Sequence, residues 1–199
     1  MSGDLMTLNG YVALTFDDGP NGNTSTLLAA LRGCGARATL FNTGENASAE
    51  PALVAIEAAA GKWIGNHSFS HPHMLALTLE QMRDELARTQ KAIEAGGGGT
   101  PRLFRPPFGE TDERLRSTSS GLGMLQTTWD VDSEDWNGAS TEAIVAAAER
   151  LGEGGVMLMH DGYATTIAAL PLIVAGLARR GLRPGMIDPN TGRAVAPGD

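Results

Sequence analysis

The sequence has a single cysteine, Cys34, which excludes a disulfide framework and a zinc site built from thiolates. It has no apolar run of about 20 residues, the length that crosses a bilayer. The formal net charge of −8 argues against a nucleic-acid binder, which would carry a basic face. The first residues also lack the basic start and apolar segment of a signal peptide. The composition therefore favours a neutral or cationic partner over a polyanion.

Strand and helix patterns alternate along all 199 residues, which predicts a parallel sheet within one domain, residues 1–199. The clearest helix start is the capping box at residues 78–81 (TLEQ). Strands are expected at residues 11–16, 36–41, 62–65, 102–105, 123–130, 155–160 and 183–187. Seven or so strands, with polar residues after most of them, favour a barrel over a doubly wound layer.

Histidine is rare in this chain, and its placement is uneven. Three of the four histidines lie within residues 67–73 (HSFSHPH), and the fourth, His160, ends an apolar strand. The imidazoles of His67 and His71 can meet one cation if the backbone turns between them. Taken alone, this spacing also arises by chance, and most histidines bind no metal. His73 is expected to be a local loop residue.

Four further polar groups lie at predicted strand ends: Asp17 with Asp18, Arg105, the acidic residues 130–135 and His160. Each has a simple structural explanation, such as a turn, a surface cation, a solvated loop or a helix cap. In a barrel, however, the loops after the strands converge on one face. Their shared position is thus more informative than any of them alone.

Together these groups have the chemistry of a metal-assisted hydrolase. One Asp and two His leave a coordination position open for water, a second carboxylate can take a proton, and a remote His can return one. Arg105 can keep a carboxylate ionised, and an Asp can keep His160 protonated. Asp17 and Asp18 can both face the site only if the strand has already turned, because consecutive strand residues point in opposite directions. Residues 19–20 (GP) are typical of such a turn.

Five short motifs in this order resemble those of carbohydrate esterase family 4, the polysaccharide deacetylases with a NodB homology domain. They are residues 15–20 (TFDDGP), 67–71 (HSFSH), 105–109 (RPPFG), 130–136 (DVDSEDW) and 158–160 (LMH). Many family members carry Tyr where this chain has Phe108. The resemblance covers most of the chain and implies a distorted (β/α)7 barrel.

The resemblance also implies a role for each motif residue. Asp18, His67 and His71 would hold a divalent transition metal, Zn²⁺ in the first place, with Co²⁺ or Ni²⁺ able to substitute. Asp17 would be the general base, oriented by Arg105. His160 would be the general acid, tuned by an Asp of the fourth motif, for which we favour Asp135 over Asp130. Substrate contacts would come from the Phe108 amide at the oxyanion and from Trp136 and Leu158 around the acetyl methyl group.

The reaction implied is hydrolysis of N-acetyl or O-acetyl groups on a polysaccharide or oligosaccharide, with release of acetate. Chitin and its oligosaccharides, peptidoglycan and acetylated xylan are all compatible with the motifs. The short connecting loops suggest an open groove and a tolerant enzyme. We expect a monomer, located outside the cell or at the cell wall, where polymeric sugars are found.

Three other functions are compatible with parts of the sequence. The same barrel and metal could cleave a non-sugar amide, in which case no acetate would be released from sugars. A carbohydrate-binding pseudoenzyme would have no need for all the catalytic residues present. A glycosidase needs two carboxylates about 5 to 9 Å apart on either side of a bond, and the adjacent Asp17 and Asp18 already have other roles.

Overall fold

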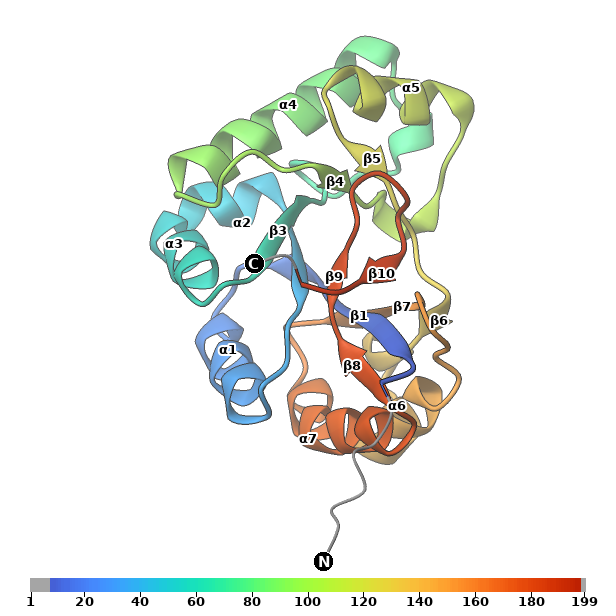
Figure 1. Ribbon diagram of the computed structural model, residues 1–199. Coiled ribbons are helices and arrows are strands. Elements are labelled where there is room, and N and C mark those ends of the chain that lie inside the picture. Colours follow the sequence, from blue (N-terminus) through green and yellow to red (C-terminus); the bar gives the residue numbers. More distant parts are fainter. Residues whose placement is uncertain (1–7, 198–199) are drawn as a thin grey trace, which may run out of the picture.

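A curled parallel sheet organises the computed structural model, which describes residues 8–197 (Figure 1). The strand order is β5-β4-β3-β2-β1-β7-β6, and β8 pairs with the early part of β1. The strands are β1 (Gly10–Gly19), β2 (Thr39–Asn42), β3 (Trp63–Asn66), β4 (Leu103–Phe104), β5 (Leu125–Gln126), β6 (Val131–Asp132), β7 (Val156–His160), β8 (Leu182–Pro184), β9 (Met186–Ile187) and β10 (Ala194–Val195). The predicted distorted (β/α)7 barrel is therefore confirmed.

Helices surround this sheet (Figure 1). The α-helices are α1 (Thr24–Gly33), α2 (Gly44–Ala49), α3 (Pro51–Ala59), α4 (Leu79–Ala95), α5 (Glu113–Gly121), α6 (Thr141–Ala148) and α7 (Ala164–Arg179). Short 3₁₀ turns occur at Met74–Ala76, Pro107–Gly109 and Asp135–Asn137. The capping box of residues 78–81 is present, with Thr78 and Gln81 each accepting a hydrogen bond from the other's backbone N–H. No helix within residues 8–197 is long and apolar enough to cross a membrane.

The alternation of side chains along β1 separates the core from the site. Val12, Leu14 and Phe16 are buried in the large apolar cluster that also contains residues of α1, α6 and α7. The side chains between them, Thr15 and Asp17, must point to the other face because the side-chain period of a strand is two. The inner face of the barrel thus receives the polar residues of its central strand.

A second apolar cluster fills the interior of the barrel, on the side away from the pocket at the carboxyl ends of the strands. Ala13, Phe41 and Val156 belong to it together with Ile187 and Ala194 of the β9–β10 hairpin. Figure 1 shows this hairpin lying across the middle of the ring of helices. The hairpin closes one mouth of the barrel, so the other mouth is the one that opens to solvent.

One predicted strand is much shorter in the structure. Within residues 123–130 only β5 (Leu125–Gln126) is a strand, and β6 (Val131–Asp132) begins just after this range, at the opposite end of the sheet order. The chain between them, residues 127–130, crosses from one edge to the other, and no β5–β6 ladder closes the sheet within the described residues. This open seam is the distortion of the barrel.

Candidate active site

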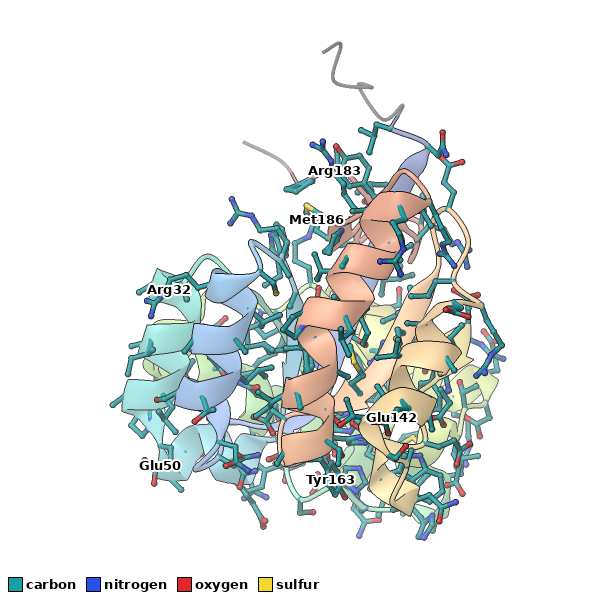
Figure 2. The ribbon with its side chains drawn as sticks, turned by 90° about the horizontal axis from the view of Figure 1, so that it is seen from below. Arg32, Glu50, Glu142, Tyr163, Arg183 and Met186 are labelled. Atoms are coloured by element: carbon teal, nitrogen blue, oxygen red, sulfur yellow. The ribbon has the colours of Figure 1, made fainter. Side chains whose placement is uncertain are left out.

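The predicted site residues meet in one pocket at the carboxyl ends of the strands. Its volume is about 410 Å³. In the side view, Tyr163 and Glu50 lie toward this end of the molecule and Arg183 and Met186 toward the other (Figure 2). The pocket is lined by Asp17, Asp18, His67, His71, Pro106, Phe108, Trp129, Asp132, Trp136, Leu158 and His160. Arg105 and Asp135 lie behind this lining, each bonded to a residue of it.

Asp17 is buried beside a fully buried arginine. The Arg105 Nη1 donates to Asp17 Oδ1 at 2.8 Å and to Thr15 Oγ1 at 2.6 Å, and its Nη2 donates to the carbonyl of Thr128 at 3.1 Å. Burial lowers the pKa of the Arg105 guanidinium, and the charge of Asp17 opposes that shift. The guanidinium also lies over the ring of Phe41, 4.2 Å from its centroid. These contacts hold Oδ1 of Asp17, whereas its Oδ2 faces the pocket, 3.6 Å from His67 Nε2.

The strand turns between the two adjacent aspartates, as the sequence required. Asp18 has a φ of 69°, in the left-handed region, and the register of β1 against β2 shifts between Asp17 and Gly19. A bulge of this kind redirects the side chain that follows it. Both carboxylates therefore face the same pocket although they are consecutive.

Asp18, His67 and His71 form a cluster with the geometry of a cation site. Asp18 Oδ1 lies 3.5 Å from His67 Nε2 and 3.6 Å from His71 Nε2, and the three ligand atoms lie within 4.8 Å of one another. His67 Nδ1 lies 2.8 Å from the carbonyl of Arg105, so it carries the proton and donates it there. The lone pair of Nε2 then points to the cluster. Burial and the neighbouring His67 lower the pKa of His71, which favours its neutral, ligating form.

His160 is held by one carboxylate from two directions. Its Nδ1 bonds to Asp135 Oδ1 at 2.7 Å, and its backbone N–H donates to Asp135 Oδ2 at 2.8 Å. Thr166 donates to the same Oδ2 at 2.6 Å. Burial alone lowers the pKa of His160, but the bond to Asp135 and the charge of Asp17 outweigh it and raise that pKa. Asp130 is engaged elsewhere, with Arg193 and the N–H of Val156, so Asp135 is the partner of His160.

Aromatic and apolar side chains form the pocket wall. Leu158 is buried, whereas Phe108 and Trp136 are 55% and 53% exposed at the rim. Phe108 has a φ of 59° and lies edge-on to His71, with ring centroids 4.7 Å apart. His73 is outside the pocket lining but stacks on Phe108 at 4.2 Å, so it does more than a local loop residue would.

Several residues of the site escaped the sequence analysis. Trp129 packs against the second apolar cluster, is only partly buried and also lines the pocket. Asn46 donates to the carbonyl of Asp18 at 2.8 Å. Asp161 accepts hydrogen bonds from Thr24 at 2.9 Å and from Asn21, and its burial raises its pKa to about 6. Its position directly after His160 was the only signal available in the sequence.

A buried carboxyl group lies beside Asn42, the last residue of β2. Glu57 of α3 is fully buried, and Asn42 Nδ2 donates to its Oε2 at 2.6 Å while Oε1 has no partner. Burial raises the pKa of Glu57 to about 8, with the bond from Asn42 opposing the shift. The Oδ1 of the same Asn42 would lie 2.8 Å from a Cβ placed on Gly19. Only glycine fits beside Asn42 at the residue that follows Asp18.

The polysaccharide deacetylase family model matches residues 6–127 of the chain. Because that is more than half of its length, the protein belongs to this family. The matched region includes the first three motifs; the residues around Asp135 and His160 follow it.

Known relatives extend the likeness over nearly the whole chain. A bifunctional xylanase/xylan deacetylase of Cellvibrio japonicus is 49% identical over 191 residues, which are 95% of this chain and 29% of that protein. The family 4 carbohydrate esterase of Streptomyces lividans, solved in complex with acetate, is 57% identical with a TM-score of 0.95 and covers 96% of this chain and 100% of its own. A Bacillus anthracis protein described as a family pseudoenzyme is 27% identical with a TM-score of 0.84, over 89% of this chain and 64% of its own. The chain thus spans 29% of the length of the xylanase relative.

Proposed function

We propose that this protein is a metal-dependent deacetylase that hydrolyses acetyl groups on polysaccharides or oligosaccharides and releases acetate. The observation that carries the proposal is the convergence of Asp17, the Asp18 cluster and His160 on one pocket of about 410 Å³. A protein that only binds carbohydrate needs neither a histidine that is hydrogen-bonded to a carboxylate, as His160 is, nor a carboxylate that is bonded to an arginine, as Asp17 is. The relationship to xylan deacetylase supports the same class.

Asp18, His67 and His71 would hold the cation, and their donor set fits it. One carboxylate and two neutral imidazoles leave a coordination position open, the usual pattern of catalytic zinc. When bound, the cation would polarise the acetyl carbonyl and make a water molecule more acidic. We propose Zn²⁺, with Co²⁺ or Ni²⁺ as substitutes, on the chemistry of these ligands.

The remaining residues divide the proton transfers. Asp17 would take the proton of the attacking water at Oδ2, since its Oδ1 is held by Arg105. His160 would donate its proton from Nε2 to the departing amine or alcohol, because Nδ1 is bonded to Asp135. The Phe108 amide would stabilise the oxyanion, and Trp136 with Leu158 would surround the acetyl methyl group.

The substrate proposal follows the pocket and the relatives. Chitooligosaccharides, acetylated xylan and peptidoglycan remain the candidates, with N-acetyl groups first and O-acetyl groups also possible for an open site. We propose a monomer of one catalytic domain, residues 1–199. We propose that the protein acts outside the cell or at the cell wall, where such polymers are found.

Acetate release tests the proposal. Metal-stripped protein would be assayed with and without Zn²⁺ or Co²⁺ on chitooligosaccharides and on acetylated xylan, side by side. We expect release only with metal, and a loss of about 10³-fold in Asp17→Asn, in the range of general-base removal. Glu134→Gln, an exposed acid outside the pocket lining, is the matched control. Metal binding without release from either sugar would favour the non-sugar amide hydrolase.

A further inference from the structure

The charges around the pocket are not balanced evenly. Asp17 has Arg105 as its partner, and Asp18 belongs to the cation site. Asp132 also lines the pocket, yet its carboxylate has no Lys, Arg or His nitrogen within 4.0 Å among residues 8–197. No Lys or Arg of that range lines the pocket either. Among the described residues that line the pocket, Asp132 is therefore the one carboxylate without a cationic nitrogen within 4.0 Å; the Arg150 guanidinium contacts its backbone carbonyl, at 3.3 Å.

Asp132 and Trp136 form one wall of the pocket. The Asp132 Oδ1 accepts the N–H of Glu134 at 2.8 Å, and its Oδ2 accepts the indole N–H of Trp136 at 3.4 Å. A carboxylate has about four lone-pair sites, so two bonds leave acceptor capacity. Because Asp132 is only partly buried and lines the pocket, that capacity is available to a ligand beside the exposed Trp136 ring.

We propose that Asp132 determines the charge class of the substrate: sugars that are uncharged or carry an amine are accepted, and sugars that carry a carboxylate next to the acetyl group are rejected. A hydroxyl or ammonium group can donate to Asp132, whereas a second carboxylate brings a like charge into a partly desolvated wall. The inference rests on the proposed deacetylase function. Since deacetylation of an N-acetyl sugar leaves an amine, partly processed chitooligosaccharides stay within the accepted class. The N-acetylmuramic acid residues of peptidoglycan, one of the substrate candidates above, fall outside it.

A matched pair of substrates isolates the charge. One is a tetrasaccharide of alternating N-acetylglucosamine and N-acetylmuramic acid, and the other is the same molecule with its carboxyls reduced to alcohols. Both would be assayed with the metal-loaded full chain at low ionic strength. We expect kcat/KM to be at least about tenfold higher for the reduced molecule, from like-charge repulsion at a separation of several ångströms.

Two variants show whether Asp132 causes the difference. In Asp132→Asn the ratio should fall below about threefold, while Glu134→Gln, which removes a charge two residues away outside the pocket lining, should keep it. Raising the salt concentration should narrow the wild-type ratio and leave the Asp132→Asn ratio unchanged. A purely structural role of Asp132 in holding Trp136 would show no such salt dependence.

Equal rates on the two tetrasaccharides, or an undiminished ratio in Asp132→Asn, would overturn the proposal. Failure of the deacetylase function has a different signature, no acetate from either molecule or from chitotetraose. In that case tryptophan fluorescence would measure binding of the same pair. Tighter binding of the reduced molecule, lost in Asp132→Asn, supports charge selection, and equal binding contradicts it.

Discussion

The site has a proposed metal half (Asp18, His67, His71) and a proposed proton-transfer half (Asp135, His160, Thr166). The two halves stand on different kinds of backbone. Asp18 and His71 have φ values of 69° and 54°, and Ser68 between the two histidines has 65°. Left-handed conformations in non-glycine residues cost on the order of 1–3 kcal/mol each. His160, in contrast, ends a regular strand and pairs in parallel register with Asp17. Its partner Asp135 begins a short 3₁₀ turn after Glu134, a left-handed residue next to this half.

The two halves also differ in what holds their side chains in place. In the proton-transfer half, the protein itself supplies the hydrogen bonds that fix the Asp135 carboxylate. The metal half brings together one carboxylate and two histidines, and few other hydrogen bonds fix the atoms that would face the cation. We expect the cation to stabilise that half and to leave the other unchanged.

The largest expected effect is on the metal half. His67→Gln should lower kcat/KM for acetate release by at least about 10³-fold, because several kcal/mol of transition-state stabilisation depend on the cation. Metal content after dialysis measures the cause directly. Glu149→Gln is the control, since Glu149 is exposed and outside both the cluster and the pocket lining. Unchanged metal affinity in His67→Gln would refute the assignment.

Glu57 makes the free energy of unfolding of the protein depend on pH. Its folded pKa, about 8, exceeds the ordinary value of 4.5, so the folded state keeps a proton that the unfolded state releases. Its contribution is thus full below pH 4.5 and lost as pH rises toward 8. Glu57→Gln should remove this loss and stabilise the protein at pH 7 by on the order of 3 kcal/mol.

Denaturant unfolding between about pH 5 and pH 8 tests this prediction. The wild-type free energy of unfolding should fall more steeply with pH than that of Glu57→Gln. Glu149→Gln, at an exposed glutamate, should follow the wild type. Parallel curves for all three proteins would show that Glu57 does not carry the effect.

The proton-transfer half should respond in its pH profile. Asp135→Asn removes the charge that raises the pKa of His160, so that pKa should fall. The general acid then loses its proton at lower pH, and the alkaline limb of kcat moves to lower pH. We expect kcat at neutral pH to drop by about 10²-fold. Metal affinity should stay at the wild-type value, and a parallel loss of metal would break the separation of the two halves.

The smallest expected effect concerns a positioning residue of the metal half. Asn46→Ala removes the donor to the Asp18 carbonyl. Outer-sphere partners of metal ligands are typically worth 10–100-fold in affinity, and we expect about tenfold here, with KM for the sugar unchanged. Competition with a chelator measures the affinity. Asn23→Ala is the control, because Asn23 is exposed and bonds to Gly162.

The site could be predicted from the sequence because each functional residue lies in the carboxyl-terminal part of a strand or in the segment that follows one. Leu158 and His160 share one face of β7 by strand alternation, and Asp17 shares a face with Thr15. What could not be predicted depends on three-dimensional partners. Asn46 lies in α2, a short helix without a strong apolar period, and its role comes from a backbone carbonyl 28 residues away.

The predicted strand at residues 123–130 illustrates the same limit for the fold. Most of its residues suit a strand, but strand assignment needs a neighbour to pair with. Leu125 finds Leu103 at one edge, and Val131 finds Met157 at the other. Trp129 lies in the crossing between them and so reaches the pocket, which composition alone did not indicate.

The central position of β1 has a consequence for synthesis on the ribosome. Ala13 pairs with Val156, and Gly10 pairs with Leu182, so one flank of the first strand waits for partners that are made about 140 residues or more later. Until then that flank is an unpaired apolar edge, the kind that templates aggregation. The proposed cation ligands Asp18, His67 and His71 are therefore made well before Val156, the residue that begins to pair the second flank of the strand carrying Asp17 and Asp18.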